Sequence, residues 1–291
     1  MYKDGDGNPH FNSYGGFMKY SPKQMNDLLS NNNFNLKKKF GQNFIIDENL
    51  IDSIINKANI DNDTLVIEIG PGAGSLTYKL ASKAKNVVCY EVDETLKPIL
   101  NETLKEYNNV EIIFNDFLKV DVLSDLKKYE YKKLYVVANL PYYITTPILV
   151  KIIEDNINVD KIVVMVQKEV GDRFKAQPNS KDYSSLSVYL NYYFEVKKLI
   201  DVSRNVFIPK PNVDSIVVEF NKNEQKQLKN KELFFKLVRD SFKQKRKNLR
   251  NNLKDYDLNK IEEVLKNYNL DLTARAEQLN IEVFEEISNN L

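Results

Sequence analysis

The chain has 291 residues, of which 42% are hydrophobic and 29% charged, and its formal net charge is +1. These values suit a globular protein with one large and one small domain, and they exclude a uniformly basic chain, so a nucleic-acid surface requires local clusters of Lys and Arg. The single Cys and single His exclude a disulfide framework and a Cys/His zinc site. With no membrane-length apolar run and no signal peptide, we expect a cytoplasmic protein without a metal.

Residues 1–17 show little apolar periodicity, and we set residues 1–33 apart as an N-terminal extension that is partly disordered. Within it, Ser21 and Pro22 predict the start of a short helix that ends near residue 30. Strand and helix patterns then alternate. Helices are predicted over 47–58, 75–84, 95–107 and 146–155, and strands over 64–69, 86–93, 110–116, 133–139, 161–167 and 213–220.

Alternation of this kind predicts an α/β fold of Rossmann-like type, with a mostly parallel sheet, right-handed crossovers and helices on both faces. The last predicted strand follows a hairpin-like PKPN segment, so we expect it to run antiparallel at or near the sheet edge. After Asn221 the sequence turns polar, and then shows helical periods without a strand signal. We therefore predict a catalytic domain over 34–222 and a small all-helical domain over 223–291.

Three predicted strands in succession end in residues suited to a nucleoside. The loop GPGAG, with Gly70 and Gly72, lets the backbone approach a ligand closely. Glu91 ends the second strand, where a carboxylate can accept hydrogen bonds from ribose hydroxyls, and Asp116 ends the third, where it can accept from an exocyclic amine. Each residue alone also fits a turn or a helix cap. Together they indicate a cleft for an adenosine-bearing cofactor.

Two cofactors compete for this cleft. NAD favours a GxGxxG loop around its pyrophosphate, and the loop here reads GxGxG. S-adenosylmethionine carries no phosphate, and its methionine part needs a close backbone approach. The spacing favours S-adenosylmethionine.

The fourth strand runs into NLPYYIT, residues 139–145. If the substrate is the exocyclic amine of a nucleobase, the side-chain oxygen of Asn139 and the carbonyl of Leu140 or Pro141 can each accept one N–H. This arrangement frees the nitrogen lone pair for in-line attack on a methyl group. Pro141 stiffens the loop, and Tyr142 offers a face for base stacking. A strand exit with a proline turn is the structural alternative.

At this point the chain resembles the small-subunit ribosomal RNA adenine dimethyltransferases, relatives of the macrolide-resistance rRNA methylases. The resemblance runs from about Phe34 to the C-terminus. The matching segments are KKKFGQNFIID, EIGPGAG, YEVD, NDFL, NLPYYIT, VFIPKPNVDS, SFKQKRKNLRNNL and ARAEQL. The last two favour the small-subunit branch.

The resemblance implies a class I methyltransferase that uses S-adenosylmethionine and yields S-adenosylhomocysteine. It assigns cofactor contacts to Asn43, Ile45, Gly70, Gly72, Glu91, Asp116 and Asn139. It also implies transfer of four methyl groups to the N6 amines of two adjacent adenines near the 3′ end of 16S rRNA, on an immature 30S subunit. The usual family residue at Ile45 is Leu, and KKKFGQ replaces a KSLGQ-like run, which leaves the packing around Phe40 open.

RNA contacts are predicted in two basic regions. Lys37, Lys38 and Lys39 precede the cleft. Arg239, Lys243, Arg246 and Arg250 fall at i, i+4, i+7 and i+11, which predicts one face of an amphipathic helix that tracks phosphates, or else a solvated face. Phe207 either adds a second wall to the base pocket or belongs to the core.

Other functions stay open at the level of the sequence. They are a large-subunit rRNA adenine methyltransferase that confers macrolide resistance, a ribosome-assembly RNA-binding factor, and an NAD-linked oxidoreductase. We expect a monomer, because no apolar surface stripe is left unassigned.

Overall fold

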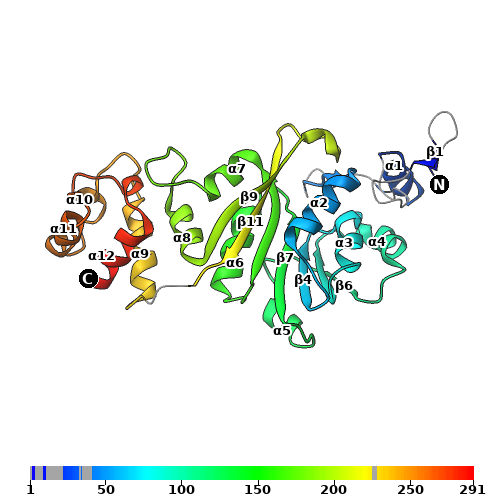
Figure 1. The fold of residues 1–291 in the computed structure, drawn as a ribbon, viewed down its shortest axis with the longest axis horizontal. Coiled ribbons are helices and arrows are strands. Elements are labelled where there is room, and N and C mark those ends of the chain that lie inside the picture. Colours follow the sequence, from blue (N-terminus) through cyan, green and yellow to red (C-terminus); the bar gives the residue numbers. More distant parts are fainter. Residues whose placement is uncertain (1, 4–8, 11–21, 33, 35–40, 225–227) are drawn as a thin grey trace. The chain divides into compact units, whose positions relative to one another are not determined.

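Apolar strands build the central sheet. In the computed structural model, which describes the chain except residues 1, 4–8, 11–21, 33, 35–40 and 225–227, seven strands lie in the order β6-β5-β4-β7-β8-β11-β9 (Figure 1). Their bounds are β4 Thr64–Ile69, β5 Asn86–Glu91, β6 Val110–Phe114, β7 Lys133–Asn139, β8 Lys161–Gln167, β9 Phe194–Val202 and β11 Ser215–Lys222. β4 is buried throughout, as expected of a central parallel strand.

The sheet is mostly parallel. β4 pairs in parallel with β5 and β7, β5 with β6, and β7 with β8. β11 runs against β8, because the amide of Lys168, directly after β8, donates to the carbonyl of Asp214, directly before β11. At the other end, Lys161 at the start of β8 pairs with Glu219 near the end of β11. The predicted fold class is confirmed, and the antiparallel strand lies second from the edge.

Helices connect the strands. Those of the sheet region are α1 Pro22–Asn31, α2 Glu48–Ala58, α3 Ser75–Ala81, α4 Lys97–Leu104, α5 Val122–Leu126 and α6 Thr145–Glu154. Because crossovers are right-handed and the strand order reverses between β4 and β7, α3 and α4 cover one face of the sheet and α6 covers the other (Figure 1).

Two short pairings involve segments outside the large sheet. β1 Tyr2–Lys3 pairs with β2 Pro9–His10, and β3 Phe44–Ile45 pairs antiparallel with β10 Phe207–Ile208. In α1, Met25 and Leu29 are buried in a cluster with residues of α4. Three predictions concern residues outside the described part of the chain. They are the helix start at Ser21, the RNA contacts at Lys37, Lys38 and Lys39, and, for most of its length, the disorder of the extension.

The chain divides into two compact units. The first comprises Met1–Lys168 and Lys198–Phe220, and the second Glu169–Lys197 and Asn221–Leu291. The second unit is helical, with α7 Lys168–Phe174, α8 Ser185–Tyr193, α9 Lys231–Ser241, α10 Leu249–Asn252, α11 Leu258–Lys266 and α12 Ile281–Asn290. No helix in the described part of the chain is long and apolar enough to cross a bilayer.

The second unit takes in a segment that the sequence placed in the catalytic domain. Residues 169–197 group with the C-terminal helices because their apolar side chains share one core with them. Tyr192 of α8, for example, lies 5.3 Å from Phe234 of α9, measured between ring centroids. The chain enters this unit twice, at Glu169 and at Asn221. The composition changes at Asn221, whereas no comparable change marks Glu169.

Candidate active site

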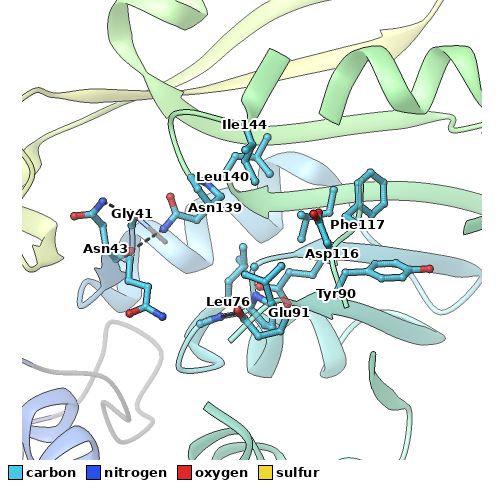
Figure 2. Close-up of a pocket in the computed structure, with 18 of the residues that line it drawn as sticks. Gly41, Asn43, Leu76, Tyr90, Glu91, Asp116, Phe117, Asn139, Leu140 and Ile144 are labelled. Atoms are coloured by element: carbon cyan, nitrogen blue, oxygen red, sulfur yellow. Dashed lines mark hydrogen bonds between the residues drawn. The ribbon is translucent and has the colours of Figure 1, made fainter. Parts of the chain in front are cut away.

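A cavity of about 530 Å³ opens at the carboxyl edge of the sheet. The chain passes from β4 outwards to β5 and β6 and then returns to β7 beside β4, so the strand order reverses at this place. Ligands of open α/β sheets bind at such reversals. Figure 2 shows Asn139, Glu91 and Asp116 around the cavity, with Asn43 beside Asn139. The predicted cofactor residues therefore come together, from four strand ends and the segment 41–45.

The glycine loop after β4 forms one wall. Gly70 and Gly72 have φ values of 73° and 58°, a region that favours glycine. A Cβ added at Gly72 would lie 2.9 Å from the ring of Phe44. The backbone at Gly72 therefore packs closely against Phe44 of β3, and a side chain at this position would clash with the ring.

Glu91 and Asp116 differ in their exposure. Glu91 is buried, and its two carboxylate oxygens accept hydrogen bonds from the amides of Gly72 at 3.3 Å and Asp93 at 2.9 Å. Burial raises the pKa of Glu91, and hydrogen bonds from backbone amides oppose the rise. The side chain of Asp116 is one-third exposed, with Lys119 Nζ 3.6 Å from one oxygen. Both carboxylates line the cavity and can accept hydrogen bonds from a ligand.

Asn139 is held in a defined orientation. Its Nδ2 donates to the backbone carbonyl of Asn43 at 2.9 Å, and the side chain of Asn43 in turn donates to the carbonyl of Gly41 at 3.0 Å (Figure 2). Because the amide nitrogen has this partner, Oδ1 is the atom left to accept from an incoming donor.

The residues after Asn139 form the turn that leads into α6. The carbonyl of Pro141 accepts from the amide of Ile144 at 3.2 Å and from the hydroxyl of Thr145 at 3.4 Å. Tyr142 is half-buried at the cavity, and its Oη lies 3.0 Å from Ser215 Oγ. Tyr143 is 60% exposed and lies against Gly41, since a Cβ there would be 3.4 Å from its ring.

The sequence patterns missed several lining residues. Val92 and Phe117 directly follow the two strand-end acids, and Val92 is 44% exposed, high for an apolar side chain in a cavity. Tyr143 follows the predicted stacking residue. Each of the three directly follows a predicted site residue, and this proximity in the sequence could have identified them.

Glu68 on β4 is a buried acid that lines the same cavity. Burial raises its pKa from 4.5 to about 8, so at neutral pH it is mostly protonated. Cys89 on β5 contacts one of its oxygens, with Sγ 3.7 Å from Oε2, and burial raises the pKa of this thiol as well. Cys89 is thus a small buried side chain.

The predicted continuous basic helix is wrong. α9 ends at Ser241 and α10 starts at Leu249, so Lys243 and Arg246 lie in the connection rather than on a face shared with Arg239 and Arg250. The end of α9 is fixed from downstream, because Asn252 Nδ2 donates to the carbonyl of Ser241 at 2.7 Å. All four cations are nevertheless exposed in the second unit.

Phe207 does not form a wall of the cavity. It is 3% exposed, pairs with Ile45 across β10 and β3, and belongs to the main core cluster. Of the two alternatives predicted for it, the core position is correct. Ile45 is also buried but reaches the cavity lining.

Comparison with known proteins identifies relatives over most of the chain. Residues 33–291 match the family model described as ribosomal RNA adenine dimethylase. "Ribosomal RNA small subunit methyltransferase A" of Bacillus pumilus (strain SAFR-032) is 47% identical over 93% of this chain and 96% of its own length, and the protein of that name from Macrococcus caseolyticus (strain JCSC5402) is 45% identical over 93% and 95%.

Solved structures agree with this relationship. A dimethyladenosine transferase from Plasmodium falciparum has a TM-score of 0.71 at 26% identity, covering 84% of this chain and 95% of that protein. The 23S rRNA methyltransferase ErmE has a TM-score of 0.68 at 26% identity, covering 85% and 99%. The sequence match over nearly the whole chain shows that this protein belongs to the ribosomal RNA adenine dimethylase family.

Proposed function

We propose that the protein methylates the N6 amines of two adjacent adenines near the 3′ end of 16S rRNA, with S-adenosylmethionine as the methyl donor. The observation that carries this proposal is the orientation of Asn139, whose amide nitrogen is bonded to Asn43 so that its oxygen is available at the glycine-lined cavity. The relatives named small subunit methyltransferase A support the choice of RNA.

The residues around the cavity fit this donor. The positive φ angles of Gly70 and Gly72 keep the loop free of side chains, where the methionine part needs a close backbone approach. Glu91 and Asp116 supply acceptors at neighbouring strand ends for ribose hydroxyls and the adenine amine. Val92 offers an exposed apolar surface that a purine would cover. The bound donor supplies a methyl group activated by a sulfonium.

Two acceptors on this chain would hold the amine of the target base. Oδ1 of Asn139 is one. The sequence left the second open between the carbonyls of Leu140 and Pro141, and the contacts favour Leu140, because the carbonyl of Pro141 already accepts two hydrogen bonds in the turn that leads into α6. With both N–H groups bound, the nitrogen lone pair turns out of the ring system and towards the methyl group. Tyr142 provides the stacking face.

A large-subunit methylase is the second candidate. The likeness to ErmE, with a TM-score of 0.68, supports a shared fold and site. Identities of 43% to 47% to small-subunit enzymes, over most of both chains, favour the small subunit. We propose that the protein acts as a monomer in the cytoplasm on immature 30S subunits.

The test is methyl transfer from labelled S-adenosylmethionine to two purified substrates. One is 30S subunits from cells that lack the modification, and the other is protein-free large-subunit rRNA. We expect up to four methyl groups per 30S subunit, located by primer extension at two adjacent adenines, and none on the large-subunit RNA. Methyl transfer to the large-subunit RNA alone would refute the assignment. A protein that transfers no methyl group to either substrate, yet fully restores maturation of the small subunit in cells that lack it, would also refute it.

A further inference from the structure

Ser215 is the serine of the VDS segment, to which the reaction described above gives no role. It is the first residue of β11, the strand that runs against β8. The amino end of an antiparallel strand meets the carboxyl ends of its parallel neighbours. This brings Ser215 to the edge of the sheet where the cavity opens, although it is not itself a lining residue.

The hydroxyl of Ser215 contacts the tyrosine of the NLPY segment. Ser215 Oγ lies 3.0 Å from Tyr142 Oη, and either oxygen can donate. Ser215 is 1% exposed, so water does not compete freely for its hydroxyl. Burial raises the pKa of Tyr142, so its phenol is protonated at neutral pH and has a hydrogen to share.

This contact holds the ring of Tyr142 at both ends. Its Cα is fixed in the turn after β7, and its hydroxyl is fixed to β11, which enters the sheet 73 residues later in the chain. A ring attached only at its Cβ can swing about its side-chain torsions, whereas a ring whose Oη is also bound keeps its long axis in one direction. A ring that is already held in position loses less conformational entropy when a base stacks against it.

We propose that Ser215 is a positioning residue for methyl transfer, which fixes the position and tilt of the Tyr142 ring against which the target adenine stacks. This inference rests on the proposed function, because it needs an adenine to be the substrate. It gives the phenol hydroxyl of Tyr142 an orienting role. The rival is a Tyr142 hydroxyl that contacts the RNA or the reacting amine directly, with Ser215 as an ordinary core residue.

A double-mutant cycle separates the two. We expect Ser215→Ala and Tyr142→Phe each to lower kcat about three- to tenfold, the size of one hydrogen bond of about 1 kcal/mol. The double variant should lose no more than either single one, because both remove the same contact. The Kd for S-adenosylmethionine, from calorimetry, should be unchanged in all three, and Ser215→Thr should recover most of the activity.

Thr64→Val is the matched control, since Thr64 is a fully buried hydroxyl residue at the opposite end of β4, bonded to Asp61 at 2.7 Å. It should lower the melting temperature as Ser215→Ala does and leave kcat unchanged. Multiplied losses in the double variant, full activity of Ser215→Ala, or an equal kcat loss in Thr64→Val would each overturn the proposal.

A readout without RNA distinguishes this inference from the proposed function. With 3-fluorotyrosine at residue 142, the fluorine resonance should shift in Ser215→Ala and stay in place in Thr64→Val. An unmoved resonance in Ser215→Ala overturns the inference, even if the wild-type protein methylates 30S subunits. Failure of the wild-type protein to methylate them overturns the proposed function instead.

Discussion

The rim of the cavity and the basic segment of the helical unit were predicted by similar reasoning, with opposite results. At the rim, Gly70, Glu91, Asp116 and Asn139 stand at or just after strand ends, and parallel strands bring their carboxyl ends to one edge whatever their order. In the basic segment, the alignment of Arg239, Lys243, Arg246 and Arg250 required one uninterrupted helix, and α9 ends at Ser241. A prediction that rests on strand topology stays correct when a local element is irregular. A prediction that rests on one continuous helix is wrong as soon as that helix is interrupted.

Removal of the side-chain amide of Asn139 is the most direct test of the residues predicted at the rim. We expect Asn139→Ala to lower kcat by about 10²–10³, the usual cost of losing one preorganised hydrogen-bond partner of the reacting group. Binding of S-adenosylmethionine should be retained, as measured by calorimetry. Asn101→Ala, on the exposed surface of α4, is the control and should be fully active. Normal turnover of Asn139→Ala would remove the proposed mechanism.

The next largest effect concerns Glu68 and pH. Its pKa is about 8 in the folded protein and 4.5 as a free side chain. Because the folded state holds this proton more tightly, its contribution to stability is complete below pH 4.5 and is lost as the pH rises through 8. Relative to wild type, Glu68→Gln should gain about 2 kcal/mol or more in free energy of unfolding between pH 5 and pH 9.

Urea denaturation at pH 5, 7 and 9 measures this difference. Cys89→Ala is the control, since it removes the neighbouring thiol and keeps the carboxyl group, so its stability should follow the wild-type pH dependence between pH 5 and pH 7, below the range in which a thiol of the unfolded chain ionises. Parallel curves for Glu68→Gln and wild type would show that Glu68 is ionised in the folded protein.

A methyl group at Gly72 tests the shape of the rim. In Gly72→Ala, the added Cβ meets Phe44 at 2.9 Å in a backbone region that favours glycine. We expect a loss of about 1–2 kcal/mol in stability and a Kd for S-adenosylmethionine about tenfold weaker. In a Phe44→Leu background the stability loss should be smaller, because the clash is with the ring. Unchanged cofactor affinity would place the ligand away from this loop.

The smallest effects are expected in the basic segment. Lys243→Ala, Arg246→Ala and Arg250→Ala should each weaken RNA binding about threefold and reduce the slope of log Kd against log salt by about 1. Lys266→Ala, an exposed residue of α11, is the control for loss of one charge in the same unit. Slopes equal to wild type in all three variants would place the RNA contact elsewhere.

The difference between the two regions also shows how far the sequence can be interpreted. The sheet, the antiparallel strand and the gathering of Gly70, Glu91, Asp116 and Asn139 at one edge follow from periodicity and strand ends. The bond from Asn139 to Asn43, the contact of Tyr142 with Ser215, and the bond from Asn252 that ends α9 do not. They join residues 96, 73 and 11 positions apart, and no local pattern encodes which partners will meet.

The pairing of β3 with β10 has a consequence for the newly made chain. Asn43 emerges from the ribosome early, but the strand that pairs with its neighbours, Phe207–Ile208, is made some 160 residues later. Until then, the segment that orients the amide of Asn139 lacks this anchor, even if the strands from β4 to β8 have already assembled. The nascent chain would thus hold the strands from β4 to β8 before β10 is available to anchor the segment beside Asn139, and this part of the cavity would form only when the first unit is almost fully synthesised.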